Sequence, residues 1–215
     1  MFTRRELLAS MAAAQFAGAL SQEPKDPGFG IEILEEPHTI AKESTRGFRL
    51  LSGLSEGDCR QHIILAPGIR NIRAQTCAEL LQRVRCGARL FFESGGCFSS
   101  AQECADQADI LNRAFGLGVL PPIRTAEISG RSPTYVSYSW PEQKSVRSYH
   151  AITPLVCDKS EAIAHFHGHV VCARKTIGRG GVVYLGSMLG PALYAEDREA
   201  HVLGDALMRS LRYDF

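Results

Sequence analysis

One stretch of the sequence, Ala88 to Ala105, limits the possible folds more than any other. The stretch opens with a short apolar run, Leu90 to Phe92, that predicts a strand over residues 89–94, and the glycine pair 95–96 predicts a turn. Ser100, followed three residues later by Glu103, has the spacing of a helix capping box. In an open α/β sheet, strand ends and helix starts meet at such turns, and backbone N–H groups point into the crevice. The stretch therefore predicts an α/β sheet with a site at this turn.

The flanking segments extend this alternation of strand and helix. Residues 62–66 predict a buried strand ended by Pro67-Gly68, and Thr76 with Glu79 predicts the start of a helix that Gly87 ends. Strand, helix and strand in this order form the parallel crossover unit. Further segments are predicted as weak strands at 31–34 and 48–51, a helix to about 115, short strands and loops over 123–150, strands at 152–157, 162–166, 170–176 and 181–186, a hairpin turn at 178–181, and a helix at 197–211. The sequence predicts a flavodoxin-like, mostly parallel α/β sheet with helices on both faces and a C-terminal β-hairpin plus helix.

Length and charge set limits on the domains and partners. The 215 residues suffice for one α/β domain, which we place at residues 31–215. Lys and Arg number 24 against 23 Asp and Glu, a net charge of +1, so no overall field would gather nucleic acid or an anionic membrane.

The N-terminal residues predict an export signal. Residues 1–21 have a short basic start, an apolar middle and small residues near the end, and they are too short and too rich in alanine to cross a bilayer. The motif from Thr3 to Leu8, TRRELL, resembles the twin-arginine export motif. We therefore expect a cleaved signal peptide, a linker at 22–30, and a periplasmic or otherwise exported domain with no membrane association after cleavage.

The seven cysteines form no regular disulfide framework. An odd number leaves at least one thiol free or paired between chains. Four of them fall on apolar faces of predicted helices or strands, and we expect these to be small core residues. The four are Cys77, Cys86, Cys104 and Cys172.

The end of the chain resembles a known superfamily. The run GRGGVVYLGSMLGPAL follows a His-Gly-His turn and a strand ending in ARKTIG, and the earlier APGIRN and CGARLFFESGG belong to the same pattern. Together these segments resemble class I glutamine amidotransferase-like domains over roughly residues 60–120 and 150–211. They are most similar to the non-catalytic members, such as the trimerisation domain of certain β-galactosidases. The resemblance implies a flavodoxin-like fold and leaves activity open, because the superfamily includes enzymes and silent members.

Active members of this superfamily carry a Gly-x-Cys-x-Gly turn and a later His-x-Glu. Here the turn is Gly95-Gly96-Cys97-Phe98-Ser99, with serine in place of the last glycine, and the sequence contains no His-x-Glu. Both departures point away from amidotransferase chemistry.

One hypothesis makes Cys97 a nucleophile. The following helix N-terminus would favour its thiolate, one of the histidines 165, 167 and 169 would act as base, with His167 as our choice, and Glu93 would orient that base. The alternative is that Cys97 is a small turn residue and Glu93 a carboxylate that meets an arginine.

A second hypothesis makes His165, His167 and His169 a metal site. On an unbroken strand their spacing of two places three imidazoles on one face, which suffices for zinc or copper. Gly168 instead favours a hairpin turn, which would separate the rings. We expect no cofactor unless this site binds zinc or copper.

A third hypothesis is a binding or assembly module. Loops that follow three parallel strands would converge at one sheet edge and offer polar groups to a sugar or a carboxylate. The expected ligand-binding residues are Arg70, Asn71, Ser94, Gly95, Gly96 and Ser187. We interpret the chain as this kind of module, without catalysis, whose partner is a small polar ligand or another protein subunit, including a second copy of the chain. A cysteine-dependent hydrolase or amidase and a metal-binding protein are the alternatives.

Overall fold

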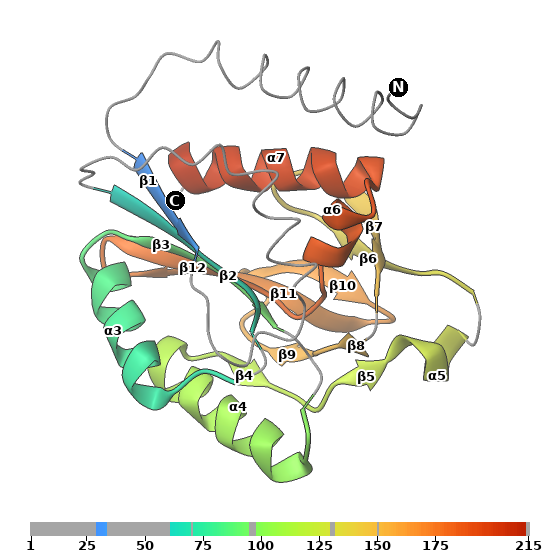
Figure 1. Ribbon diagram of the computed structural model, residues 1–215, viewed down its shortest axis with the longest axis horizontal. Coiled ribbons are helices and arrows are strands. Elements are labelled where there is room, and N and C mark those ends of the chain that lie inside the picture. Colours follow the sequence, from blue (N-terminus) through green and yellow to red (C-terminus); the bar gives the residue numbers. More distant parts are fainter. Residues whose placement is uncertain are drawn as a thin grey trace, which may run out of the picture.

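A mixed eight-stranded sheet forms the centre of the molecule (Figure 1). The computed structural model describes residues 29–33, 61–69, 71–94, 98–129, 132–149 and 151–213. The predicted signal peptide at 1–21, nearly all of the linker at 22–30 and the predicted strand at 48–51 lie outside these ranges. The strands, in their order across the sheet, are β1 (Phe29–Ile33), β2 (Gln61–Ile69), β3 (Arg89–Ser94), β12 (Gly180–Leu185), β11 (His169–Ile177), β10 (Ala162–Phe166), β6 (Thr134–Tyr138) and β7 (Lys144–Ser148).

The half of the sheet from β1 to β12, which we call the parallel half, contains only parallel pairings among its own four strands. Residues 63–66 of β2, residues 90–94 of β3 and all of β12 are buried, so both faces of these strands lie against a core. In β2, Ile63 and Leu65 belong to one core, and Ile64 and Ala66 belong to the core on the other face. The strand and helix alternation predicted from the sequence is confirmed here.

The half from β11 to β7, the antiparallel half, pairs only through antiparallel neighbours. The prediction of a mostly parallel, flavodoxin-like sheet is therefore only partly correct, because the whole sheet is mixed. The physical reason lies in the connections. The turns at residues 167–168 and 178–179 are too short for a crossover, so each must join antiparallel strands. The predicted C-terminal hairpin is β11 and β12.

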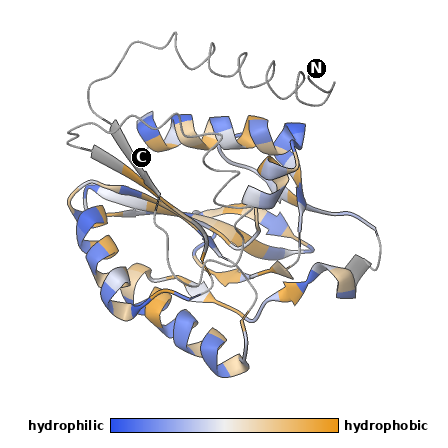
Figure 2. Ribbon diagram, in the orientation of Figure 1, coloured by the Kyte–Doolittle hydropathy of each residue, from blue (hydrophilic) through white to orange (hydrophobic). Residues whose placement is uncertain are grey.

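Helices cover the sheet on both faces (Figure 1). On one face α3 (Ala74–Arg85) and α4 (Ala101–Phe115) enclose a core with β2, β3 and β12. On the other face α6 (Gly190–Tyr194) and α7 (Arg198–Tyr213) enclose a second core that continues under β10, β6 and β7. The colouring by hydropathy follows this layering, with hydrophobic residues concentrated in the sheet (Figure 2). The final helix predicted at 197–211 is confirmed.

The remaining described elements are small. Two-stranded ribbons and one short helix lie beside the main sheet: β4 (Gly118–Val119) with β9 (Leu155–Val156), β5 (Ile123–Arg124) with β8 (Ala151–Ile152), and α5 (Thr125–Ser129). The single strand predicted at 152–157 is thus divided between β8 and β9. Pro154 lies between them, and it has no backbone N–H to donate to a strand ladder.

Two boundaries differ from the prediction. Helix α3 begins at Ala74, so Thr76 lies inside its first turn and does not cap it. Strand β2 continues through Pro67-Gly68 to Ile69 by means of a bulge, because residues 66 to 69 face residues 92 to 94 of β3. Gly68 has φ of 57°, a conformation that glycine adopts without strain.

The described cysteines are free. Cys77, Cys104 and Cys172 are buried, as predicted, but Cys86 is exposed because it follows the last residue of α3 at the surface. None of the helices in the described ranges is long and apolar enough to cross a membrane.

Candidate functional site

The predicted site lies where β2, β3 and β12 end at one edge of the sheet. Four of the residues predicted there fall outside the described ranges: Arg70, Gly95, Gly96 and Cys97. Their proposed roles stay predictions. Glu93, Ser94, Asn71 and Ser187 are described, and their surroundings follow.

Glu93 lies in the interior, on the side of α6. Its side chain has no exposed surface, and its Oε1 accepts a hydrogen bond of 2.8 Å from the backbone N–H of Gly190, the first residue of α6. This hydrogen bond fixes the start of α6 against the end of β3. The carboxyl group for which we expected an arginine or a catalytic base as partner thus has a backbone N–H among its partners.

Ser187 is also an interior residue, only 2% exposed. Its Oγ lies 2.7 Å from the hydroxyl of Tyr138 and 3.8 Å from the Sγ of Cys172, and that sulfur lies 3.9 Å from the Tyr138 hydroxyl. Burial raises the pKa of Tyr138 well above its usual value and raises the pKa of Cys172 to about 12. The three groups therefore stay protonated and bonded to one another.

These polar residues occupy one row across the sheet. Glu93 pairs with Leu185, Leu185 with Cys172, Cys172 with Ala164, and Ala164 with Tyr138. Residues paired in this way point to the same face, here the face covered by α6 and α7. Ala164 has a small side chain, which leaves room for the tyrosine ring to extend toward Cys172. The row is a buried hydrogen-bonding seam, and it does not open to solvent.

Ser94 takes part in a second internal contact. It is 3% exposed, and its Oγ lies 3.3 Å from the Oγ1 of the fully buried Thr153. Asn71, which precedes α3, is partly exposed and is the one described member of the predicted ligand set at the surface. The structure thus brings Ser94, Glu93 and Ser187 to the same sheet edge, as predicted, but it directs all three inward.

The three histidines do not form a metal site. His165 is an exposed residue of β10, His167 lies in the turn with φ of 46° and its ring packs edge-on against Phe166, and His169 begins β11. The turn separates the rings, and within the described ranges no group of three His, Cys, Asp or Glu side chains could hold a metal ion. The last residue of β12, Leu185, pairs with Cys172 of the antiparallel strand β11. The turn that precedes β11, with His167, therefore lies beyond the C-terminal end of β12, at the sheet edge where the site is predicted.

The start of α4 follows the predicted capping pattern. The Oγ of Ser100 accepts a 3.1 Å hydrogen bond from the backbone N–H of Glu103. The carboxylate of Glu103 in turn accepts hydrogen bonds from the backbone N–H and the hydroxyl of Ser99. Both sets of hydrogen bonds fix the chain at residues 99–103, shortly after Cys97 in the sequence.

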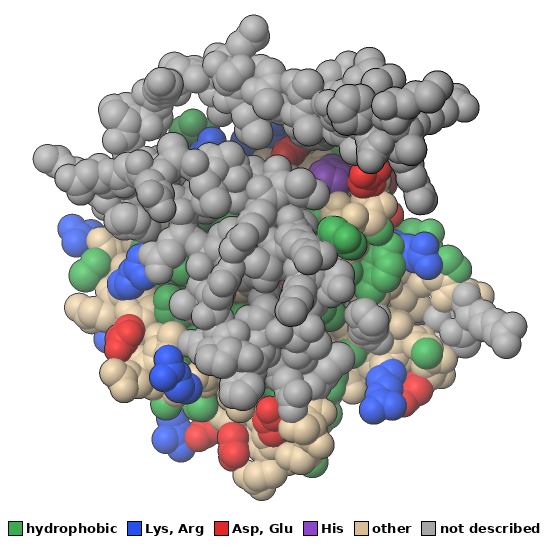
Figure 3. Space-filling view, viewed as in Figure 1, with side chains coloured by type: hydrophobic (Ala, Val, Ile, Leu, Met, Phe, Trp, Pro, Cys, Tyr) green, Lys and Arg blue, Asp and Glu red, His purple; other side chains and the backbone are tan. Residues whose placement is uncertain are grey.

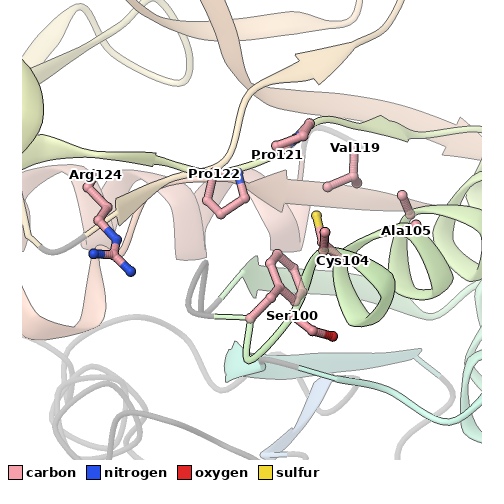
Figure 4. A pocket seen from close by; sticks show the side chains of 10 residues that line it. Ser100, Cys104, Ala105, Val119, Pro121, Pro122 and Arg124 are labelled. Carbon is pink, nitrogen blue, oxygen red and sulfur yellow. The ribbon is translucent and has the colours of Figure 1, made fainter.

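A hollow of about 480 Å³ opens beside this capped end of α4 (Figure 4). Its wall is largely apolar, with Ser100, the thiol of Cys104 and the guanidinium of Arg124 as polar groups. Figure 4 shows Cys104 on α4 and Ser100 just before this helix, with Pro121 and Pro122 opposite them on the segment that joins β4 to β5. The apolar lining residues are Phe98, Ala101, Ala105, Ala108, Val119, Pro121 and Pro122.

No motif in the sequence points directly to this hollow. Arg124 falls in the range 123–150 for which short strands and loops are predicted, and no site is predicted there or at Pro121-Pro122. The alanines at 101, 105 and 108 lie at helical spacing and so share one face of α4. Their side chains are too small to fill the space between this face and the two prolines, and this run of small residues is the indirect sign of the hollow in the sequence.

Basic and acidic side chains are interspersed over the coloured part of the visible surface (Figure 3), in agreement with the net charge of +1.

Comparisons with known proteins place the fold and no more. No family model and no curated protein matches the chain. A cytoplasmic protein from Salmonella typhimurium LT2 is similar in structure, with a TM-score of 0.58 at 10% identity over 85% of this chain and 99% of that one. A β-galactosidase from Bacillus circulans sp. alkalophilus gives 0.57 at 11% identity over 93% of this chain, and an exo-β-1,4-mannosidase from Opitutaceae bacterium strain TAV5 gives 0.52 at 10% identity over 96%.

The chain spans about a third of that β-galactosidase, 33% of its length, and 39% of the mannosidase. The resemblance to a part of β-galactosidases is therefore confirmed at the level of a distant fold relation. The wider resemblance to amidotransferase-like domains is not tested by these matches.

Proposed function

We propose that this chain is a non-catalytic α/β domain that binds a ligand or joins an assembly connected with carbohydrates. Support comes from the fold, which is shared with part of a β-galactosidase and part of an exo-β-1,4-mannosidase. We further propose that the domain belongs with the silent members of the amidotransferase-like superfamily, and that residues 1–21 direct its export to the periplasm.

The observation that carries the proposal is that the described polar side chains at the sheet edge make contacts within the protein interior. Glu93 bonds the start of α6, Ser94 contacts Thr153, and Ser187 contacts Tyr138. Side chains engaged in this way stabilise the interior and are not presented to a substrate. The hollow beside α4, in contrast, is open at the same edge of the sheet and has unfilled space.

The lining of the hollow indicates the ligand chemistry. Its volume of about 480 Å³ lies in the range of small-molecule sites, about 300 to 1,000 Å³. One face of a sugar ring is apolar and would pack against Phe98 and Pro122, while its hydroxyls would meet Ser100 and Arg124 at the rim. The hollow therefore suits a small ring-shaped ligand with polar edges.

A pair of helix variants tests this site. Ala105→Phe places a ring in the hollow, whereas Gln102→Phe places the same ring on an exposed part of α4 that does not line it. Lactose and a β-1,4-linked mannose disaccharide are the probes, with binding followed by ligand-observed NMR. We expect Ala105→Phe to abolish binding and Gln102→Phe to preserve it.

Assembly is measured on the same samples by light scattering. A chain that binds neither sugar and stays monomeric over the accessible concentration range would contradict the proposal. Sugar binding that survives Ala105→Phe would move the ligand site away from the hollow.

The runner-up function is a cysteine-dependent hydrolase or amidase that uses Cys97. One observation favours it: the residues directly after Cys97 cap a helix of 15 residues, and the N-terminus of such a helix favours a thiolate. Alkylation of Cys97 at a pH well below the ordinary thiol pKa of about 8.5 would support this function and would lead to a screen of amides and esters.

A further inference from the structure

We propose that the outer face of the antiparallel half binds an acidic polysaccharide, a polymer of sugar rings that carry carboxylates. The outer face consists of the exposed side chains of Tyr135, Ser137, Ser145, Arg147 and His165. This surface is distinct from the hollow beside α4, so the inference goes beyond the proposed ligand site.

The strand register arranges these side chains in an array. Tyr135 pairs with Arg147, and in the next row of the same face Ser137 pairs with Ser145 on one side and His165 on the other. Neighbouring strands lie about 4.8 Å apart, and alternate residues along a strand about 7 Å apart. The array therefore measures about 10 Å by 7 Å, which matches a flat ligand of one or two sugar rings.

The array rests on a rigid support. The residues that alternate with it, Val136, Tyr138 and Val146, are buried in the core under α7. Helix α3 packs on β3 and β12, and α4 packs on α3 and β4, so these two helices leave the outer face of β6 and β7 open. Tyr135 is accordingly 53% exposed.

The chemistry of the outer face suits a carboxylate on a sugar. The guanidinium of Arg147 lies over the ring of Tyr149, 5.1 Å from its centre, which restrains the plane of the charged group. A guanidinium held in one plane can donate two parallel hydrogen bonds to a carboxylate. The ring of Tyr135 can pack on the apolar face of a sugar, and the serines and His165 can bond its hydroxyls.

Charge separates this partner from other anions. The five side chains include one permanent cation, Arg147, and no carboxylate. A nucleic acid backbone carries a phosphate on every nucleotide and is bound by several Lys and Arg residues together. One arginine among hydroxyls and an aromatic ring fits a polymer with one carboxylate per sugar ring.

Calorimetric titration of the full chain with oligogalacturonate tests the proposal. A neutral galacto-oligosaccharide of the same length and oligoglutamate, which has carboxylates without sugar rings, are the comparison ligands. The variants are Arg147→Ala and Tyr135→Ala, and Arg113→Ala is the matched control because its side chain is 79% exposed on α4, which packs on α3 and β4 and contributes no residue to the outer face. Thermal unfolding checks that each variant is folded, and Arg147→Gln replaces Arg147→Ala if the latter is destabilised.

We expect the wild type and Arg113→Ala to bind oligogalacturonate equally, and Arg147→Ala and Tyr135→Ala to bind about tenfold or more weakly, the size expected for a lost charge-assisted bond. Absence of binding by the wild type overturns the proposal. If Arg147→Ala and Arg113→Ala lose the same affinity for oligogalacturonate, the attraction is due to general charge, and the proposal is overturned. If the wild type binds oligoglutamate as tightly as oligogalacturonate, the partner is an acidic peptide, and the proposal is overturned as well. If the neutral galacto-oligosaccharide binds as tightly as oligogalacturonate, the proposed role of the carboxylate is overturned. Lactose binding in the hollow should be unchanged by these variants, so the two proposals fail separately.

Discussion

The two halves of the sheet use their strands in different ways. In the parallel half, helices cover both faces, and every residue of β12 is buried. In the antiparallel half, the strands β6 and β7 alternate buried and exposed residues, because α7 covers one face and the other is open. The comparison teaches that stability is concentrated in the first half, whereas the second half can present side chains to a partner at little cost to the fold.

Thiol reactivity gives the largest expected contrast between the covered interior and the surface. Burial raises the pKa values of Cys77, under α3, and Cys172, in β11, to about 12 each. Near neutral pH their thiolate fraction is about a thousandfold below that of a thiol with the ordinary pKa of about 8.5 to 9. Among the cysteines that the structure describes, we expect the exposed Cys86 to be alkylated first in the folded protein, and mass spectrometry after timed alkylation measures the order. Rapid alkylation of Cys172 would mean that the interior opens readily.

The same pKa values predict alkaline unfolding. The raised values hold the folded thiols protonated while the unfolded thiols ionise, so their contribution to stability is complete below about pH 9 and is lost as the pH rises toward about 12. Denaturant titrations at stepped pH measure this fall.

Truncation of an aromatic core residue should show where the stability lies. Phe92 of β3 is 2% exposed and stacks on Tyr184 of β12 with ring centres 5.5 Å apart. We expect Phe92→Ala to lower the free energy of unfolding by about 3 to 5 kcal/mol and Tyr135→Ala, on the outer face, to change it by about 0.5 kcal/mol or less. Urea denaturation measures both, and similar losses would remove the distinction between the halves.

A glycine at the junction of the halves tests close packing there. A Cβ on Gly186 would lie 2.0 Å from the carbonyl oxygen of Thr153 and 2.6 Å from that of Val171, so backbone would have to move. We expect Gly186→Ala to cost about 3 kcal/mol. Gly168→Ala is the control for backbone strain alone, with φ of 82° and open space around it, and should cost about 1 to 2 kcal/mol. A smaller loss for Gly186→Ala than for Gly168→Ala would contradict the packing argument.

The carboxylate of Glu93 should act as a structural group. Glu93→Ala leaves the buried N–H of Gly190 without this acceptor and is expected to cost about 1 to 3 kcal/mol, while Glu93→Gln keeps an acceptor and should cost less. Thermal unfolding compares the two. Equal stability of all three proteins, together with a loss of amidase activity, would favour the catalytic role instead.

A small effect is also expected for an ion pair at the surface of the antiparallel half. Lys144 of β7 and Glu199 of α7 form an ion pair of 3.0 Å with partly exposed side chains. We expect Lys144→Ala to lower the free energy of unfolding by about 1 kcal/mol or less, and the loss should shrink in high salt. Urea titrations at several salt concentrations measure this loss. Arg113→Ala, which removes the exposed ion pair between Arg113 and Asp109 on α4, is the comparison.

The sequence predicted the parallel half well because long apolar runs, turn glycines and the Ser100 cap are strong local signals. The antiparallel half was predicted less well, since β6 and β7 are short and rich in Ser, Tyr and Arg, a composition shared with loops. At the site, the residue positions were right for Ser94 and Ser187, but their direction was not. Local sequence does not reveal which face of a strand end a later element covers, and here α6 and Thr153 cover it.

The contact between Gln107 and Ile72 has a consequence for motion near the site. The Oε1 of Gln107, a buried residue of α4, accepts a 2.7 Å hydrogen bond from the backbone N–H of Ile72, just before α3. That amide belongs to a loop, yet it can exchange its hydrogen with solvent only when α4 moves away. Deuterium uptake at Ile72 should therefore follow the opening of α4 and not that of its own loop, and it offers a single-residue reporter for ligand entry into the neighbouring hollow.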